Sequence, residues 1–307
     1  MHLLVPYAGT ISPAGQHALK DLTLPHLERL LARLSPVHTL GQDEHSLSLP
    51  HELALAAARG WALVDGALPW AAELAGQQGL AVGEHAWALL SPVHLHAGAE
   101  QVSLANPAEL PLDEATSRTL FDAVQHLFTS EGFALHWVAP QQWLATHPLF
   151  DELATASIDR AIGRNVDPWL PEQRSARLLR RLQNEVQMLL YTHPLNDERE
   201  AAGLPTVNSF WCGGCGRAQR SAGEPLPVID DRLRQPALRE DWATWREAWL
   251  ALDAGPIADL AHANGPLQLT LCGERLAVRW ERAPRGLWQR LRSTWQRRTA
   301  ADLLEPL

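Results

Sequence analysis

The sequence predicts an α/β protein, with a mixed α+β arrangement as the alternative. Segments with apolar residues at helical spacing alternate with short strand-like segments along the whole 307-residue chain. Hydrophobic residues make up 46% of the chain and charged residues 20%, a composition typical of globular proteins. The sequence has no internal repeat and no low-complexity linker, so we expect one large domain. Weak boundaries are expected near 145–172 and 216–236, where proline and glycine gather.

In the first half of the chain, helices are expected where leucine or alanine recurs at helical spacing. Strands are expected where short apolar or alternating runs end at proline or glycine. In chain order, the expected elements are a strand within 2–9, helices at 24–34, 49–60 and 69–79, strands at 85–98 and 100–107, a helix at 112–132 and a strand at 133–144.

The second half begins with a proline-broken region, 145–172, that predicts only short helices. The expected elements that follow are a long helix at 174–194, a helix at 239–255 with three tryptophans on one face, and a hairpin at 266–281. The long helix is expected to end at Pro194. Its apolar stripe is formed by Leu178, Leu182, Val186 and Leu189.

The formal net charge of −9 opposes a nucleic-acid-binding function, which would need a basic surface. The segment 282–298 is nevertheless strongly basic, and it predicts an amphipathic helix. We expect this helix to pack on the body of the protein. The alternative is that it docks a protein partner or a membrane surface.

The location of the protein is predicted from what the sequence lacks. No segment approaches the roughly 18 apolar residues of a membrane span. The N-terminal segment has neither a basic region nor an apolar run of signal-peptide length. Three cysteines do not make the even-numbered framework of a secreted disulfide-rich protein. We therefore expect a cytoplasmic protein.

The stretch NSFWCGGCG places Cys212 and Cys215 in a C-x-x-C pattern. A reactive dithiol needs its first cysteine at the N-terminus of a helix, and the glycines and proline that follow this pair oppose a helix. A structural zinc site needs four ligands, but Cys272 stands alone in its expected strand. His94 and His96 lie on one side of an expected strand, without a third ligand. The sequence therefore predicts no metal site, and the sulfur is expected to be incidental.

The segment 191–217 resembles a pattern of the archaeal-type cofactor-independent phosphoglycerate mutases. In that pattern a helix leads into HP-x-N-x-x-R, and a short loop leads into N-x-x-W-x-W-G-x-G. The matching residues are His193, Pro194, Asn196, Arg199, Asn208, Trp211, Gly214 and Gly216. Gly213 stands where the family has its second tryptophan. Over most of its length the chain is also similar to the RpfE-type regulatory proteins of proteobacteria, in the segments 3–8, 91–98, 102–107 and 208–216.

The mutase resemblance implies an alkaline-phosphatase-like fold, here a degenerate sheet of that kind flanked by helices. Such enzymes hold two divalent metal ions with Asp and His and phosphorylate a Ser or Thr nucleophile. In this family the first strand ends in a metal-binding Asp, whereas this chain has Pro6 and Tyr7 there, and it contains no Asp-Ser pair.

These departures from the family pattern lead us to expect a non-catalytic binding or regulatory protein with no catalytic residues, metal or cofactor. One alternative is a metal-dependent phosphotransferase or phosphoglycerate mutase with a rearranged site. A third is a thioredoxin-like dithiol oxidoreductase.

A ligand site is expected where the glycine-rich turn 208–216 meets the helix end at 193–199. Exposed backbone N–H groups at glycines can form a nest for an anion, and two arginines would add positive charge. The expected site residues are His193, Asn196, Arg199, Asn208, Trp211, Gly214, Gly216 and Arg217. The expected occupant is a small anionic ligand or a protein partner. The alternative is a buried turn that serves only the fold.

Overall fold

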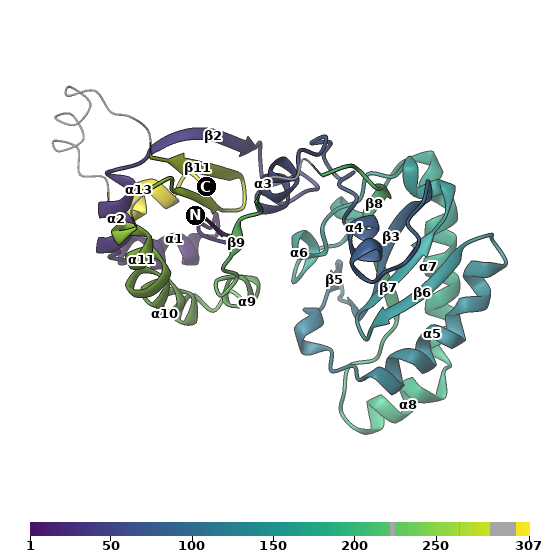
Figure 1. Ribbon diagram of the computed structural model, residues 1–307. Coiled ribbons are helices and arrows are strands. Elements are labelled where there is room, and N and C mark those ends of the chain that lie inside the picture. Colours follow the sequence, from purple (N-terminus) through teal and green to yellow (C-terminus); the bar gives the residue numbers. More distant parts are fainter. Residues whose placement is uncertain (222–224, 264, 283–298) are drawn as a thin grey trace. The chain divides into compact units, whose positions relative to one another are not determined.

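The computed structural model describes residues 1–221, 225–263, 265–282 and 299–307 (Figure 1). Apart from Arg282, the expected basic helix at 282–298 lies outside these residues. The chain forms two compact units, Met1–Trp61 with Ser221–Leu307 and Ala62–Arg220. One of the two crossings between units, at Arg220 and Ser221, lies within the segment 216–236. The expectation of a single folding domain stays a prediction.

The first unit is built on a five-stranded mixed sheet (Figure 1). Strand β1 runs parallel to both of its neighbours, β9 and β10, whereas β11 is antiparallel to β10 and to β2. Across the sheet the strands are β2 (Ser35–Gly41), β11 (Leu276–Glu281), β10 (Gln268–Cys272), β1 (His2–Val5) and β9 (Val228–Ile229).

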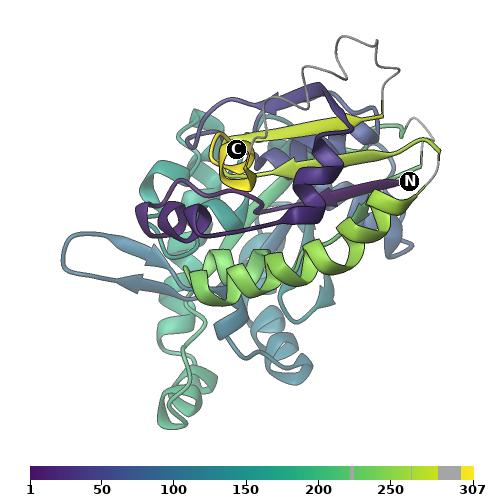
Figure 2. The same cartoon turned by 90° about the vertical axis from the view of Figure 1, so that its left-hand side faces the viewer.

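Helices cover both faces of this sheet because its central strands are apolar on both sides. In β1, Leu3 and Val5 belong to the larger core, while Leu4 belongs to a smaller core formed with α3 (Pro50–Ala58). Figure 2 shows α10 and α11 lying along the face of the larger core. The other helices of this unit are α1 (Pro13–Lys20), α2 (Pro25–Leu31), α9 (Arg234–Leu238), α10 (Trp242–Leu252), α11 (Ala258–His262) and α13 (Ala300–Leu304).

A carboxylate distant in the sequence caps α2. Leu24 at the start of α2 has no side-chain oxygen to accept the first helical N–H groups. Asp253 accepts them instead, from His26 at 3.2 Å and from Leu27 at 2.7 Å. Asp253 is buried and begins a π-helical segment, Asp253–Ile257, that joins α10 to α11. The π-helical segment therefore carries the residue that caps the N-terminus of α2.

The second unit is built on a four-stranded antiparallel sheet. Its strands, in spatial order, are β6 (Ala134–Ala139), β7 (Gln142–Thr146), β3 (Ala86–Val93) and β8 (Ser209–Arg217). A separate two-stranded hairpin consists of β4 (Leu95–Ala97) and β5 (Val102–Leu104).

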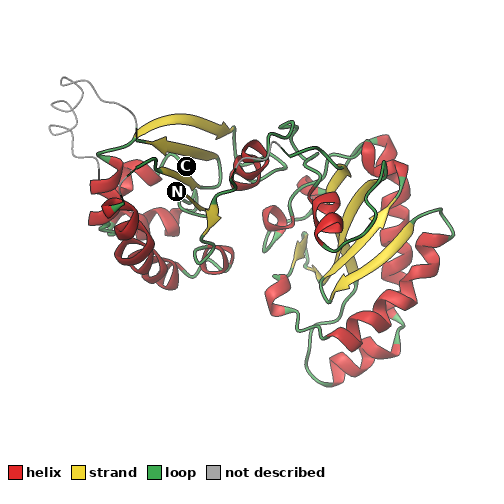
Figure 3. Ribbon diagram, viewed as in Figure 1, coloured by secondary structure: helices red, strands yellow, loops and turns green. Residues whose placement is uncertain are grey.

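Helices also cover both faces of this second sheet (Figure 3). Short side chains of α4 (Trp70–Gln77) pack on one face, and α5 (Glu114–Thr129) and α7 (Arg177–Tyr191) pack on the other. The remaining helices are α6 (Ile158–Ala161), α8 (Pro194–Ala201) and four 3₁₀ turns at Pro107–Glu109, Pro148–Asp151, Asp167–Trp169 and Arg174–Ala176.

The α/β class is confirmed, since the described residues form mixed sheets flanked by helices. The single strand expected at 133–144 is wrong, because Pro140 and Gln141 turn the chain into the β6–β7 hairpin. Pro194 does not simply stop a helix. It occupies the first turn of α8, where its missing N–H costs nothing. Strand β2 was not expected, since its middle residues are exposed on both faces and lack alternation.

The apolar stripe of the long helix is confirmed in part. Leu182 and Val186 are buried as expected. The other buried leucines are Leu179 and Leu190, one position beyond the expected ones, while Leu178 and Leu189 are only partly buried.

Candidate functional site

The expected site residues all lie in the second unit, along α8, the loop after it and β8. His193 caps α8, because its Nδ1 accepts the backbone N–H of Leu195 at 3.2 Å. This ring nitrogen therefore serves the helix start.

Asn196 ties the end of α7 to the segment before β8. Its side-chain amide donates to Leu190 O and to Val207 O, both at 2.8 Å, and its Oδ1 accepts from Val207 N at 3.0 Å. Asn196 is 4% exposed. Both amide hydrogens are therefore used by the backbone, and the side chain has no donor left for a ligand.

Arg199 is also buried, and its Nε donates to Pro205 O at 2.8 Å. Its Nη2 has no hydrogen-bond partner among the described residues. Burial lowers the pKa of Arg199 from its ordinary value, and the negative charge of Asp113 opposes that shift. The Nη2 group of Arg199 is thus a hydrogen-bond donor that no described residue uses.

Asn208 pairs with the backbone of Leu95 as a strand residue would. Its Oδ1 accepts from Leu95 N at 2.7 Å, and its Nδ2 donates to Leu95 O at 2.8 Å. The backbone N–H of Asn208 donates to Val93 O at 3.1 Å. Asn208 therefore holds the start of β8 against the link between β3 and β4.

The glycine-rich turn expected at 208–216 is wrong, because residues 209–217 form strand β8, which pairs with β3. In that pairing Leu89 lies opposite Gly213 and Trp87 lies opposite Gly216. Ala88 alone therefore faces the two residues between those glycines, which is the geometry of a β-bulge. The sequence signal for it was the glycine pair inside an apolar run.

The glycines of β8 also allow α4 to approach closely. Gly214 has φ +64°, a conformation that favours glycine. A Cβ there would lie 3.1 Å from Ala71 N and from Trp70 Cβ at the start of α4. A Cβ at Gly216 would lie 3.3 Å from Pro69 Cβ. On the same strand, Trp211 donates from Nε1 to Ala156 O at 3.0 Å.

Arg217 lies at the far end of β8 and is already paired. Its Nε lies 2.7 Å from Asp151 Oδ2, and its guanidinium also donates to Glu84 O. Nine strand residues extend over roughly 25 Å, so Arg217 is far from Asn208. The structure thus brings Asn196, Arg199 and Asn208 to one end of β8 and leaves Arg217 at the other. One small ligand does not reach both ends.

Cys212 and Cys215 are free, buried thiols whose Sγ atoms lie 3.7 Å apart. They lie within a strand, not at a helix N-terminus. The hydrogen bond with Cys215 and burial raise the pKa of the Cys212 thiol well above its ordinary value. A dithiol oxidoreductase needs a lowered thiol pKa, so this geometry opposes the thioredoxin-like alternative.

His94 and His96 do lie close together, with ring centroids 6.4 Å apart. His94 Nδ1 lies 2.8 Å from Thr206 O, so one of its nitrogens is used by the loop before β8. Within the described ranges, no three His, Cys, Asp or Glu residues gather closely enough to hold a metal ion.

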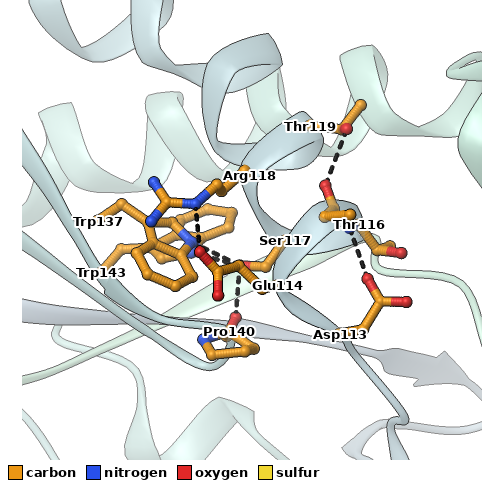
Figure 4. A network of polar contacts seen from close by, with 10 residues as sticks. Asp113, Glu114, Thr116, Ser117, Arg118, Thr119, Trp137, Pro140 and Trp143 are labelled. Carbon is orange, nitrogen blue, oxygen red and sulfur yellow. Dashed lines mark hydrogen bonds and ion pairs between the residues drawn. The ribbon is translucent and has the colours of Figure 1, made fainter.

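A buried hydroxyl that the sequence did not single out lies between α5 and the β6–β7 hairpin (Figure 4). Ser117 is fully buried and donates to Pro140 O at 2.7 Å. It accepts from Nε1 of Trp137 at 2.9 Å and from Nε1 of Trp143 at 3.1 Å. Its hydrogen and both lone pairs are therefore used, and it is no candidate nucleophile.

An ion pair lies over one of these tryptophans. The Arg118 guanidinium lies 3.8 Å from the centre of the Trp137 ring and pairs with Glu114 at 2.8 Å (Figure 4). A cation over an indole face is attractive, so this contact adds to the attachment of α5 to β6.

In the first unit, the loop after β1 occupies the place where the mutase resemblance implies a metal-binding Asp. Tyr7 in this loop has φ +56°, and its carbonyl accepts Nε1 of Trp245 at 3.0 Å. Glu274 Oε1 accepts from Thr10 Oγ1 and from Ile11 N, both at 3.2 Å. A carboxylate from the β10–β11 turn therefore binds the polar groups of this loop.

The segment 299–307 packs at the same end of β1 and β10. The carbonyl of Leu307 accepts the N–H groups of Arg275 at 2.7 Å and Leu276 at 2.8 Å. A Cβ at Gly9 would lie 2.5 Å from Leu304 O, and one at Gly273 would lie 2.4 Å from Leu307 C. This end of the sheet is therefore closed by the chain's own residues.

No protein-family model matches the chain, and no curated protein matches it. Several solved protein chains are similar to it, among them the following two. The cofactor-independent phosphoglycerate mutase from Thermoplasma acidophilum DSM 1728 has 12% identity, covers 91% of this chain and 89% of its own, and gives a TM-score of 0.37. The PH0037 protein from Pyrococcus horikoshii has 11% identity, covers 92% of this chain and 87% of its own, and gives a TM-score of 0.43. Similarity this low assigns no activity to this chain. In the part of the chain that the structure describes, every helix is too short or too polar to cross a membrane.

Proposed function

We propose that this chain is a non-catalytic binding or regulatory protein, related to the cofactor-independent phosphoglycerate mutases but without their catalytic site. The observation that carries the proposal is the loop after β1. Pro6 and Tyr7 stand there in place of a metal-binding carboxylate, and Glu274 hydrogen-bonds to the loop. Two divalent cations need several anionic oxygen ligands, and this loop offers none from its own residues.

The finer form of the proposal is a regulatory protein of the RpfE type that acts in the cytoplasm. Its occupant would be a protein partner or a small anionic ligand rather than nucleic acid, given the net charge of −9. For a small anion, the favoured contact is the unused Nη2 of Arg199, which is buried and is reached only when the surrounding residues move aside. The hydrogen bond from Arg199 Nε to Pro205 O already orients the guanidinium group, which lowers the entropy cost of binding a ligand at Nη2.

The enzyme alternative is tested by a mutase assay. The purified chain is incubated with 3-phosphoglycerate and Mn²⁺ or Zn²⁺, and 2-phosphoglycerate is measured against a matched blank. We expect no turnover. Turnover that EDTA abolishes would contradict the proposal and favour a rearranged metal site.

The ligand is tested by thermal unfolding with 3-phosphoglycerate or inorganic phosphate, compared with chloride at equal ionic strength. A bound anion raises the midpoint in proportion to the logarithm of its concentration. The control variant is Arg199→Lys, which keeps the charge but loses the planar fork. A rise in wild type that the variant lacks supports an anion at Arg199. No rise in wild type excludes both tested anions, so the protein-partner form of the proposal remains.

A further inference from the structure

We propose that Cys212 and Cys215 form a redox modification site, at which a low-molecular-weight disulfide converts the two thiols into an intrachain disulfide. This inference is independent of the proposed function, and it replaces the expectation that the sulfur is incidental.

The β-bulge is what brings the two thiols together. In a regular strand, residues three positions apart point to opposite faces of the sheet. The extra residue opposite Ala88 reverses that order, so Cys212 and Cys215 both belong to the core that α5 and α7 cover. Their Sγ atoms lie in contact at 3.7 Å. A disulfide needs about 2 Å, so a closing movement of less than 2 Å is sufficient.

The residues between the thiols permit this closure. Gly213 and Gly214 have no side chains that would resist a change of backbone angles. Strand β8 is also an edge of its sheet, paired only with β3, so it can open locally without separating two strand pairs. The third cysteine, Cys272, lies in the interior strand β10 of the first unit and has no thiol beside it.

Exposure assigns an order to the two thiols. Cys212 is 7% exposed, whereas Cys215 is fully buried. Cys212 therefore attacks the small disulfide first and releases one small thiol. Cys215 then attacks the mixed disulfide at Cys212 and releases the second. In total, two protein thiols and one small disulfide give one protein disulfide and two small thiols, so atoms and electrons balance. Because the hydrogen bond with Cys215 and burial raise the pKa of Cys212, we expect the reaction to be slow at neutral pH and faster as pH rises.

The test treats the folded full-length chain with oxidised glutathione. After acid quenching and denaturation, the remaining thiols are alkylated and located by peptide mass spectrometry. We expect two of the three thiols to disappear with loss of two hydrogen atoms, and to return with dithiothreitol. Cys272 should remain alkylatable throughout. Circular dichroism confirms that the chain stays folded under the conditions used.

Three variants separate the roles. Cys272→Ala should form the same disulfide. Cys215→Ala should accumulate a glutathione adduct at Cys212, and Cys212→Ala should stay unmodified over the same time. A disulfide that includes Cys272, or loss of all three thiols at one rate, would show that the reaction follows global unfolding and would overturn the proposal. Three intact thiols in the folded wild-type chain, at a time when the urea-unfolded chain has lost its thiols, would also overturn it. An adduct at Cys215 in Cys212→Ala would overturn the assigned order.

Discussion

Strands β1 and β8 both adjoin segments that the sequence marks as informative, but these segments are held in place in different ways. The loop after β1 is held by Glu274, whose partner Ile11 lies 263 positions away. The approach to β8 is held by Asn196, whose partner Val207 lies 11 positions away. Local polar side chains therefore organise β8, whereas distant segments close the end of β1.

This difference shows why the motif residues around β8 are recognisable in the sequence. An N-x-x-R pattern followed by an asparagine is a compact set of side chains that bind nearby backbone groups. The end of β1 depends instead on contacts that arise only when the two halves of the first unit meet. Substitutions at the two strands should therefore lower the stability by different amounts and for different reasons.

The largest loss is expected from Asn196→Ala. The substitution leaves Val207 N–H and two buried carbonyls without their partner, and such losses add to about 3 kcal/mol of unfolding free energy. Urea denaturation measures it. The matched control is Glu200→Ala on the exposed side of α8, expected within about 0.5 kcal/mol of wild type. Equal losses would contradict a specific role for the Asn196 amide.

A smaller loss, about 2 kcal/mol, is expected from Gly9→Ala at the end of β1. Its Cβ would lie 2.5 Å from the Leu304 carbonyl, so α13 must move. The control is Gly255→Ala in the same unit, where a Cβ would meet nothing within 4 Å. If Gly9→Ala unfolds at the same urea concentration as its control, the packing of α13 against β1 is loose.

Gly214→Ala and Gly203→Ala separate backbone strain from packing at β8. Both glycines have similar φ, +64° and +71°, but only Gly214 has α4 within 4 Å. We expect Gly203→Ala to cost about 1 kcal/mol through strain alone and Gly214→Ala to cost about 2 kcal/mol. Thermal unfolding of the pair gives the difference. If Gly203→Ala lowers the stability as much as Gly214→Ala does, then packing of α4 against Gly214 adds nothing to the loss.

The smallest effect is expected from Arg217→Ala. Arg217 and Asp151 are both well exposed, and exposed ion pairs contribute less than about 1 kcal/mol. The loss should shrink further in high salt. A double-mutant cycle with Asp151→Ala measures the coupling. A coupling above that range, unchanged by salt, would mean that this end of β8 is more rigid than its exposure suggests.

Much of the fold could be predicted from local patterns. The helices expected at 24–34 and 49–60 and the hairpin expected at 266–281 agree with α2, α3 and the β10–β11 hairpin. Local patterns do not predict contacts between residues that are far apart in the sequence. Asp253 caps α2 from 226 positions away, and nothing near Leu24 signals that partner.

The sequence predicts that some of the motif residues lie together, but it does not predict their geometry, and the binding role of these residues stays a prediction. His193, Asn196 and Asn208 do lie near one another, as the motif suggests. Glycine is commonest in turns, so the glycine-rich stretch predicts a turn, yet a bulged strand uses glycine for the same left-handed conformation. A turn would place Arg217 next to Asn208, whereas the strand places it at the opposite end of β8.

The division of the chain into one interrupted and one continuous unit has a consequence for synthesis on the ribosome. Residues 62–220 form an uninterrupted unit and can fold as soon as they emerge. Strand β1 is made long before its two neighbours, β9 and β10, which come from beyond residue 221. The apolar segment 3–5 must therefore wait unpaired through the synthesis of more than two hundred residues. Until then β1 is an unpaired apolar strand, the kind of segment that chaperones protect.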